Sequence, residues 1–374
     1  MARNREHDAC PGALHVHRAA DGALARVRLP GGSITPAQLQ ALATAATRWG
    51  SATLELTSRA NIQVRGIDDD ATAAVADAVA AAGLLPSPTH ERIRNIVASP
   101  LSGRVGATTD VRATVAELDE AIRARPGLAA LPGRFLFGVD DGRGDISGLA
   151  ADAGVHVDGD SAALLLAGRD TGVRLTLPQV VPALVDVAQR FTEIRETAWR
   201  VAELGDPARL LTDLPVTAPA GATWETVTRP PVGWIEQRDD RIALGAAVPL
   251  GVLPARTAEF LAAIDAPMAI TPWRSVLVFD LDEARADTAL RVLAPMGLVF
   301  DERSPWLSIS ACTGSPGCAH SAADVRADAA AAAAAGPAAG HRHFVGCDRA
   351  CGSPGVGEVL VATGDGYRPR SASP

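Results

Sequence analysis

Four of the five cysteines in this 374-residue chain lie in two close pairs. Five residues separate Cys312 from Cys318, and three residues separate Cys347 from Cys351. Closely spaced thiols in a chain with no recognisable secretion signal favour metal ligation over disulfide formation. The two pairs therefore predict a metal centre within residues 309–355.

The spacing of the cysteines indicates which metal to expect. Structural zinc sites usually take cysteines two to four residues apart, so a five-residue first loop is long for zinc. Iron-sulfur clusters accept wider and more varied spacings. Small residues that let the backbone fold around a bulky inorganic core, and offer it amide donors, occupy both loops. They are Gly314, Pro316, Gly317, Gly352, Pro354 and Gly355. The pattern favours a cluster, with zinc or unrelated buried thiols as alternatives.

Composition limits the classes of protein that fit. The length and a hydrophobic content of 47% predict two or three domains. The net charge of -8 argues against a nucleic-acid partner. Every basic side chain is arginine, which weakens the evidence from any single arginine. The sequence shows no signal peptide and no apolar run of about 20 residues, so we expect a cytoplasmic protein with no membrane partner.

The elements that must position the cysteines repeat along the chain. Residues 25–29 read as a strand, 36–48 as a helix, 53–57 and 61–67 as strands, and 68–83 as a capped alanine-rich helix. The same β-α-β-β-α order returns at 242–248, 254–264, 268–271, 275–281 and 283–293.

Sequence similarity supports this duplication. LTSRANIQVRGI (56–67) and ITPWRSVLVFDL (270–281) align without a gap, and Gly83 then falls on Gly297. RIRNIVASPLSG (92–103) falls on PWLSISACTGSP (305–316), so the segment that enters the first cysteine loop has a cysteine-free counterpart. Two copies of one unit are predicted, each a ferredoxin-like half followed by a longer segment. Chance similarity is the alternative.

Further elements are expected between and after the copies. Residues 131–141 contain a strand, residues 162–167 and 173–177 are strands, and residues 178–204 form an amphipathic helix. The proline-rich stretch 205–231 reads as a linker, and 319–335 as a helix between the cysteine pairs. The predicted domains are residues 1–87, 88–228, 229–303 and 304–374.

The cysteine signature, the duplication and TSRANIQVRG (57–66) resemble the sirohaem-dependent nitrite and sulfite reductase superfamily. The resemblance implies an α+β fold with two ferredoxin-like half-domains forming one domain, plus two mixed α/β domains around a pseudo-twofold axis. It also implies that Cys312, Cys318, Cys347 and Cys351 ligate a 4Fe-4S cluster. Cys351 matches the cysteine that bridges to the haem iron in the reductases.

The same resemblance implies a set of arginines around a tetrapyrrole. Arg59 and Arg94 match arginines that face the macrocycle or its substrate in the family. Arginine suits this role because its planar fork binds a carboxylate through two charge-assisted hydrogen bonds. The alternative for each is an ordinary surface residue. Further candidates for substrate binding are Arg65, Arg134, Arg92 and Arg104.

Two departures argue against the reductase activity of the family. Arg134-Phe135-Leu136 stands where the reductases carry a pair of cations, so that one cation is replaced by leucine. Ala60 replaces the family's glutamine. Reduction of a small oxyanion requires a strongly positive pocket, which these changes weaken.

Within the superfamily, the chain resembles the precorrin-3B synthases more closely. The resemblance lies in Cys10-Pro11-Gly12, LARVRLPGG (24–32) and NIVASPLSG (95–103). It implies an O2-dependent monooxygenase that hydroxylates precorrin-3A at C20 with γ-lactone formation in aerobic cobalamin biosynthesis. The implied cofactors are the 4Fe-4S cluster and a mononuclear non-haem iron, with a separate reductase as electron donor.

Two other classes stay open. In a sirohaem-dependent sulfite or nitrite reductase, sirohaem would be a cofactor, and a third class is a cluster or zinc protein without catalysis. The non-haem iron often takes two histidines and one carboxylate. No pattern selects its ligands from His15, His17, His90, His156, His320, His341 and His343, and no catalytic residue is predicted. GRGDISG (142–148) has the wrong glycine spacing for a dinucleotide site, and Cys10 is not expected to be a ligand.

Overall fold

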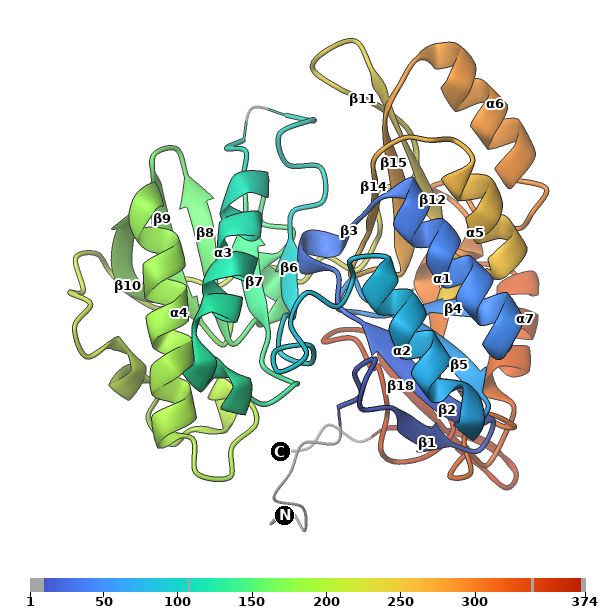
Figure 1. Ribbon diagram of the computed structural model, residues 1–374, viewed down its shortest axis with the longest axis horizontal. Helices are drawn as coiled ribbons and strands as arrows, with labels where there is room; N and C mark the ends of the chain where they lie inside the picture. The colour runs from blue at the N-terminus through green and yellow to red at the C-terminus, as the bar shows by residue number, and fades with distance from the viewer. Residues whose placement is uncertain (1–9, 107, 338–339, 371–374) are drawn as a thin grey trace. The chain divides into compact units, whose positions relative to one another are not determined.

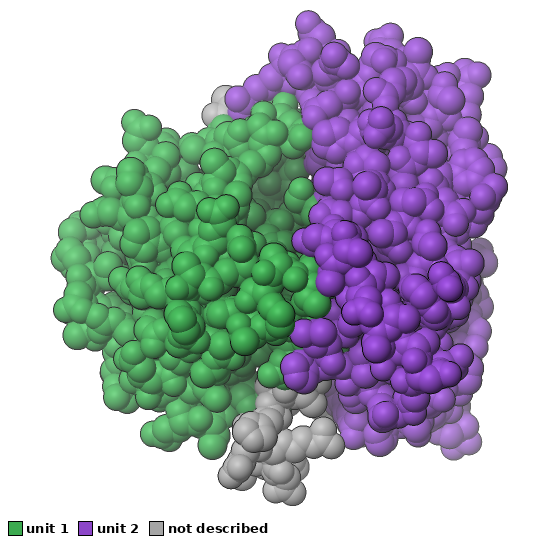
Figure 2. All heavy atoms as spheres, viewed as in Figure 1, with its two compact units in different colours: residues 1–12, 27–33, 84–227 green, residues 13–26, 34–83, 228–374 purple. Residues whose placement is uncertain are grey.

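The computed structural model describes residues 10–106, 108–337 and 340–370. The chain forms two compact units, coloured separately in Figure 2. Unit 1 comprises Met1–Gly12, Val27–Ser33 and Leu84–Val227, and unit 2 comprises Ala13–Arg26, Ile34–Gly83 and Thr228–Pro374. None of the helices in the described part of the chain combines the length and the hydropathy that a membrane span requires.

The first repeat copy in unit 2 builds a five-stranded sheet in the order β1-β2-β5-β4-β13. Its strands are β1 (His17–Ala19), β2 (Gly22–Val27), β5 (Ile62–Ile67), β4 (Thr53–Leu56) and β13 (Val252–Pro254). Helix α1 (Pro36–Trp49) lies over β4 and β5 and packs against α2 (Thr72–Ala81) (Figure 1). Thr35 caps α1, because its hydroxyl accepts from the Gln38 N–H while the Gln38 side chain accepts from the Thr35 N–H.

The second copy repeats this arrangement with the order β11-β12-β15-β14-β3. Its strands are β11 (Gly233–Glu236), β12 (Ile242–Ala247), β15 (Ser275–Leu281), β14 (Met268–Ile270) and β3 (Ser33–Ile34). The helices are α5 (Ala255–Ala262) and α6 (Glu283–Leu293). The bounds of α6 are those predicted, since the Asp282 carboxylate caps its first turn by accepting from the Arg285 N–H.

The two copies exchange their edge strands. β13 of the second copy pairs with β4 of the first, with Leu253 opposite Leu54, and β3 of the first copy closes the sheet of the second. In each sheet the strand at one end of the order comes from the other copy. The two ferredoxin-like halves form one body, as the predicted fold class requires.

Matching turns in the two sheets confirm the repeat. The Thr57 N–H donates to the Asn61 carbonyl at 2.9 Å, and the Thr271 N–H donates to the Ser275 carbonyl at 2.9 Å. The fourth residue of each turn is left-handed, with φ of 55° at Ala60 and 56° at Arg274. Such agreement in an unfavourable conformation is not expected from chance similarity.

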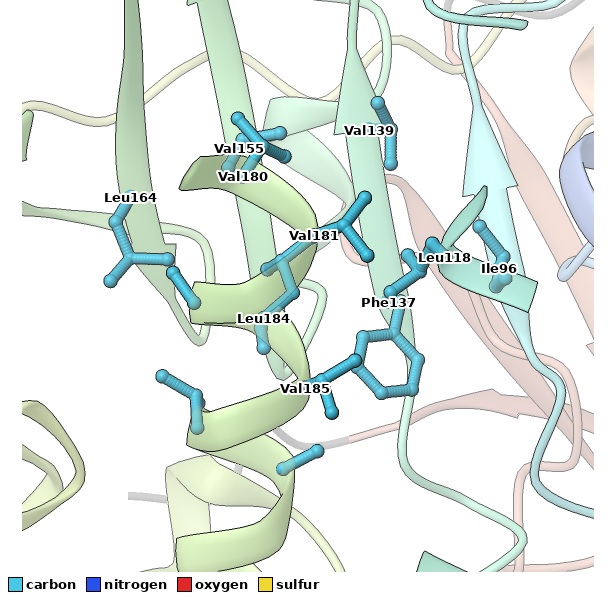
Figure 3. Packing of buried hydrophobic residues seen from close by; sticks show 14 of the residues in the cluster. Ile96, Leu118, Phe137, Val139, Val155, Leu164, Val180, Val181, Leu184 and Val185 are labelled. Atoms are coloured by element: carbon cyan, nitrogen blue, oxygen red, sulfur yellow. The ribbon is translucent and has the colours of Figure 1, made fainter. Parts of the chain in front are cut away.

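Unit 1 contains a sheet in the order β10-β9-β8-β7-β6. Its strands are β6 (Ile96–Ala98), β7 (Phe137–Asp140), β8 (Ala153–Asp158), β9 (Ser161–Leu166) and β10 (Arg169–Thr176). Helices α3 (Arg112–Ala124) and α4 (Leu177–Ile194) pack on it. Figure 3 shows Val181, Leu184 and Val185 of α4 directed toward Phe137 and its neighbours in the buried core.

One predicted helix in unit 1 was too long. The sequence pattern predicted a helix over 178–204, but α4 ends at Ile194. Glu196 adopts a left-handed φ of 48°, which a continuous α-helix does not allow. The chain continues through a short 3-10 turn at Val201–Glu203.

A four-stranded sheet in unit 2, β16-β17-β18-β19, carries the cysteines. Its strands are β16 (Ile309–Ala311), β17 (Arg342–Val345), β18 (Glu358–Thr363) and β19 (Gly366–Pro369). Helix α7 (Val325–Ala334) packs against β16 and β17. This helix was predicted to begin at residue 319, but the Asp324 carboxylate caps it at its actual start, and the residues before the cap belong to the first cysteine loop.

The sheets that follow the two half-domains share one topology. β6, β7 and β8 are parallel and β9 is antiparallel, as are β16, β17, β18 and β19. β6 and α3 begin 213 residues before β16 and α7, while β7, β8 and β9 begin 205 residues before β17, β18 and β19. The loops after β6 and β16, after β7 and β17, and after β8 and β18 therefore have equal lengths in the two copies, whereas the connection from α7 to β17 is shorter than that from α3 to β7. The four predicted domain boundaries stay a prediction.

Candidate metal centre

The parallel strands β16 and β17 place the two cysteine pairs at one sheet edge. Cys312 directly follows β16, Cys318 lies later in the same loop, and Cys347 and Cys351 lie in the loop after β17. Parallel neighbours end on the same side of a sheet, so these loops are brought together. The Gly346 N–H donates to the Cys312 sulfur at 3.3 Å, which links the two loops directly.

The four thiols of these loops differ in exposure. All four thiols are free, with Cys351 exposed and the others half-buried. Among the described residues, no three of these sulfurs lie within 4.8 Å of one another. A tetrahedral zinc ion would hold them about 3.8 Å apart. Partial burial, together with the nearby charges of the other three sulfurs, raises the pKa of the Cys351 thiol.

Both cysteine loops contain a position where the packing leaves room for glycine alone. A Cβ at Gly346 would lie 1.8 Å from the Ser321 hydroxyl oxygen, and a Cβ at Gly317 would lie 2.8 Å from a methyl group of Thr313. A side chain at either position would force the loops apart. Both glycines thus permit close approach of the backbone; Gly317 was singled out from the sequence, whereas Gly346 was not.

Arg65 anchors the first cysteine loop. Its guanidinium donates to the Gly317 carbonyl at 3.0 Å and to the Asp21 carboxylate at 2.8 and 3.1 Å. Its side chain is only 8% exposed, and Glu55 lies 3.7 Å away. Arg65 was predicted to bind substrate, but its fork already binds a carboxylate and the loop.

Glu55 extends this anchor to helix α7. Its carboxylate accepts from Arg326 of α7 at 2.5 Å and from the Gln63 amide at 3.2 Å. Gln63 in turn accepts from Arg26. A buried carboxylate is tolerated only when it is paired in this way, so Glu55 ties the first half-domain sheet to the helix between the cysteine pairs.

His343 anchors the second cysteine loop from β17. It is fully buried, its Nε2 lies 3.0 Å from the Cys351 carbonyl oxygen, and its Nδ1 lies 2.7 Å from Ser310 Oγ. Burial lowers the pKa of His343 to about 4, so the ring is neutral at pH 7. His341 shares the same serine, with Nε2 2.8 Å from Ser310 Oγ. The sequence pattern treated these histidines only as possible iron ligands.

The remaining predicted arginines differ in their surroundings. Arg94 is buried and forms a bidentate pair with Asp119 of α3 at 2.6 and 2.9 Å, so its fork is occupied. Arg134 is exposed and lies over the Trp199 ring at 5.0 Å. Arg59 is half-buried in the turn after β4. Arg92 and Arg104 are half-buried as well.

Leu136, which stands where the reductases carry a cation, lies in the interior. Its side chain is 5% exposed and Phe135 beside it is fully buried. The backbone N–H of Leu136 donates to the buried Asp152 carboxylate at 2.9 Å. An apolar residue suits this buried strand entry, where an unpaired cation would be unfavourable.

The histidines do not assemble an iron site among the described residues. His15, His17 and His320 are exposed. Both ring nitrogens of His90 are hydrogen-bonded, one of them to the Arg125 carbonyl. His156 stacks on Trp224 with ring centroids 4.6 Å apart.

The closest group of ligand atoms in the described chain was not predicted. It consists of Asp140, Asp141 and Asp145, whose oxygens lie within 4.8 Å of one another after β7. Arg143 lies against this group and donates a hydrogen bond to Asp141 at 2.7 Å. Burial and the neighbouring carboxylates raise the pKa of Asp145 to about 7. The only signal in the sequence was the run of acidic residues that follows a strand.

Cys10 belongs to unit 1, whereas the other four cysteines belong to unit 2. Its sulfur accepts a hydrogen bond from Arg28 at 3.3 Å, and the buried Arg28 also donates to the Pro11 carbonyl at 3.1 Å. These contacts favour a structural role for Cys10 in holding the N-terminal segment.

Comparisons with known proteins agree with this architecture. Residues 15–82 match the nitrite/sulfite reductase ferredoxin-like half domain. A precorrin-3B synthase from Sinorhizobium sp is 28% identical over 380 residues, covering 96% of this chain and 81% of that protein. A ferredoxin-nitrite reductase from Synechococcus elongatus is 31% identical over 127 residues, covering 32% of this chain and 25% of that protein.

A solved structure shows the same fold. The NirA protein of Mycobacterium tuberculosis superposes with a TM-score of 0.79 at 19% identity, covering 93% of this chain and 73% of that chain. The predicted fold class and the predicted resemblance are both confirmed. The protein has the nitrite/sulfite reductase-like fold and, over nearly its whole length, is similar to a precorrin-3B synthase.

Proposed function

We propose that the protein is a monooxygenase of the precorrin-3B synthase type, acting on precorrin-3A as a tetrapyrrole substrate. The observation that carries this proposal is the similarity to a precorrin-3B synthase across 96% of the chain. The proposed reaction consumes O2 and two electrons, places one oxygen atom on C20, and closes a γ-lactone with an acetate side chain. The second oxygen atom leaves as water.

The donor set supports a 4Fe-4S cluster on Cys312, Cys318, Cys347 and Cys351. The four free thiols lie in the two loops at one end of β16 and β17, the spacing of Cys312 and Cys318 in the sequence is long for zinc, and glycines let the two loops approach closely. When bound, such a cluster supplies single electrons, which a separate reductase would deliver. Its surroundings in this chain are set by Arg65, Glu55 and His343.

The tetrapyrrole carries carboxylates around its rim, which arginine binds well. Arg59 is a candidate because it is half-buried in the turn after β4, at the position that the resemblance indicates. Arg134 is a second candidate through its exposed position. Arg59→Ala is expected to weaken precorrin-3A binding roughly tenfold to a hundredfold, with an unchanged cluster spectrum. Arg59→Lys should recover part of the loss. Unchanged binding by Arg59→Ala would remove this residue from the site.

The resemblance also implies a mononuclear iron. Among the residues that the structure describes, no two histidines and one carboxylate lie close enough together to bind it. The group of Asp140, Asp141 and Asp145 contains no histidine, and Arg143 already donates to Asp141. We therefore derive no step through this iron, and the proposal concerns the overall reaction and the cluster.

A sirohaem-dependent reductase is the second candidate. The observations in its favour are the fold shared with NirA and the partial match to a ferredoxin-nitrite reductase. Against it stand the buried Leu136 and Ala60 at positions that are polar in the reductases.

One set of measurements separates these functions. The protein, reconstituted without oxygen, is assayed for iron, acid-labile sulfide and its absorption spectrum, and then given precorrin-3A, O2 and an artificial electron donor. The proposal expects iron and sulfide without a macrocycle band, and a product heavier by one oxygen atom. A bound isobacteriochlorin with sulfite or nitrite turnover on the order of 1 per second would establish the reductase instead, and zinc without sulfide would exclude both.

A further inference from the structure

His343 contacts the loop of the most exposed cysteine. Cys351 is the exposed member of the four, so packing of its own side chain holds it less firmly than the others. His343 lies on β17, the strand that leads into this loop, and is fully buried. Its Nε2 lies 3.0 Å from the Cys351 carbonyl oxygen. A side chain fixed by the core therefore contacts the backbone of an exposed ligand position.

The partners of His343 determine which atom donates each hydrogen bond. A carbonyl oxygen only accepts, so the Nε2–H of His343 must donate to Cys351. In the neutral ring Nδ1 then accepts, and the Ser310 hydroxyl donates to it over 2.7 Å. That hydroxyl has one hydrogen, so His341 Nε2–H donates to the Ser310 oxygen over 2.8 Å. The three side chains form one directed chain that ends at Cys351.

A second contact holds the next residue of the same loop. Arg274 donates to the Gly352 carbonyl at 3.2 Å. Arg274 occupies the left-handed position of the turn Thr271–Ser275, with φ of 56°, and its side chain packs against Gly251. The carbonyls of Cys351 and Gly352 are thus held by side chains from different elements, and these two contacts fix the direction of the backbone at the fourth cysteine.

We propose that His343 is a positioning residue for Cys351: through Ser310 and the Nε2–H bond to the Cys351 carbonyl, it holds the fourth sulfur in place for cluster binding. The inference rests on the proposed cluster. The inference predicts a specific result. Without the Nε2–H donor, Cys351 should bind its iron atom of the cluster less firmly, while the fold stays intact.

The test compares three variants of the full-length protein. His343→Phe keeps the ring and removes both nitrogens, and His343→Gln keeps an N–H donor at similar reach. His320→Phe is the matched control, since His320 is exposed and lies two residues from Cys318. Each protein is reconstituted without oxygen, and the rate at which a chelator removes iron is followed with the cluster spectrum.

We expect His343→Phe to release iron about tenfold faster than the parent, with an altered spectrum. We expect His343→Gln to recover most of the difference and His320→Phe to match the parent. Equal rates for parent and His343→Phe would overturn the inference, as would equal losses in His343→Phe and His343→Gln, because that result indicates packing alone.

Two further measurements keep the test decisive. Circular dichroism of the cluster-free proteins shows whether His343→Phe folds. If it does not, Ser310→Ala replaces it, and iron release roughly threefold faster than in the parent supports the inference, whereas the parental rate overturns it. A parent that binds no cluster would overturn the proposed function together with this inference, whereas a parent with a full cluster and an unaffected His343→Phe overturns the inference alone.

Discussion

The loops after β16 and β17 can be compared position by position with the loops after β6 and β7. Strand order, strand direction and loop lengths agree between the two copies. The residues that match the four cysteines, in chain order, are Ser99, Val105, Gly142 and Ile146. One backbone frame thus carries a thiol set in the second copy and no thiol in the first.

The first-copy loops are closed by their own polar groups. The Ser99 hydroxyl donates to Asp145 at 2.6 Å and accepts from the Asp141 N–H at 3.1 Å. Asp140 is fully buried and accepts from the backbone N–H groups of Ile146 and Ser147 at 2.8 Å. The polar groups that point inward are satisfied within the loops.

The second-copy loops are held by side chains that lie outside the loops themselves. Arg65 reaches the first loop from β5, and His343 reaches the second from β17. Of these four sulfurs, that of Cys312 accepts a hydrogen bond from the Gly346 backbone N–H. The comparison shows that the shared backbone frame brings two loops together in each copy. The side chains then decide whether the polar groups of the loops bind one another, as in the first copy, or leave thiols that a metal can bind, as in the second.

The largest expected effect comes from the cysteines themselves. Changing Cys312, Cys318, Cys347 or Cys351 singly to alanine should abolish the cluster or convert it to a lesser form, because each sulfur is taken as an iron ligand. Iron and sulfide analysis after reconstitution measures this. Cys10→Ala is the control and should retain the parental content. Full iron and sulfide in Cys347→Ala would refute the ligand set.

Arg65 tests whether the second-copy loops depend on support from outside. Arg65→Ala should lower the free energy of unfolding by about 1.5–3 kcal/mol, because Asp21 and the Gly317 carbonyl lose their partner. Denaturant unfolding of the cluster-free protein measures the loss. Arg112→Ala is a suitable control, since its pair with Asp110 is exposed. If Arg65→Ala instead weakens precorrin-3A binding at unchanged stability, the residue belongs to the substrate site.

Gly346 tests how closely the cysteine loops approach. Gly346→Ala should destabilise the protein by about 1–3 kcal/mol and hinder cluster assembly, because its methyl group would overlap Ser321. Thermal unfolding and cluster content are the measurements. Gly364→Ala is a control, because its Cβ would meet no atom within 4 Å. A normal cluster in Gly346→Ala would show that the loops adjust easily.

The smallest effect concerns the first copy and depends on pH. The pKa of Asp145 is raised from 3.8 to about 7, so the folded state holds this proton more tightly than the unfolded state. The resulting stability is fully present below about pH 4 and is lost as pH rises through 7. Asp145→Asn should therefore stabilise the protein by about 1–2 kcal/mol at pH 8, with little effect at pH 4. Unfolding curves at both pH values that show equal shifts would contradict the assignment.

The sequence by itself determined the duplication and most helices and strands, and it predicted the metal ligands. Cap residues such as Thr35 and Asp282 mark helix starts by local hydrogen bonds, and local signals can be read without a structure. The match of Thr57 with Thr271 revealed the repeat because both copies need the same strained turn. The cysteine pairs were readable because ligand spacing within one loop is a local property.

Only the tertiary structure decided what the arginines and histidines do. Arg65 and Arg94 have the residue type that binds a tetrapyrrole carboxylate, yet their forks meet Asp21 and Asp119, residues 44 and 25 positions away. His343 contacts Cys351 because the loop after β17 folds back onto that strand. A charged or polar side chain binds whichever partner the fold brings within about 3 Å, and contacts between distant segments are set by packing rather than by local sequence.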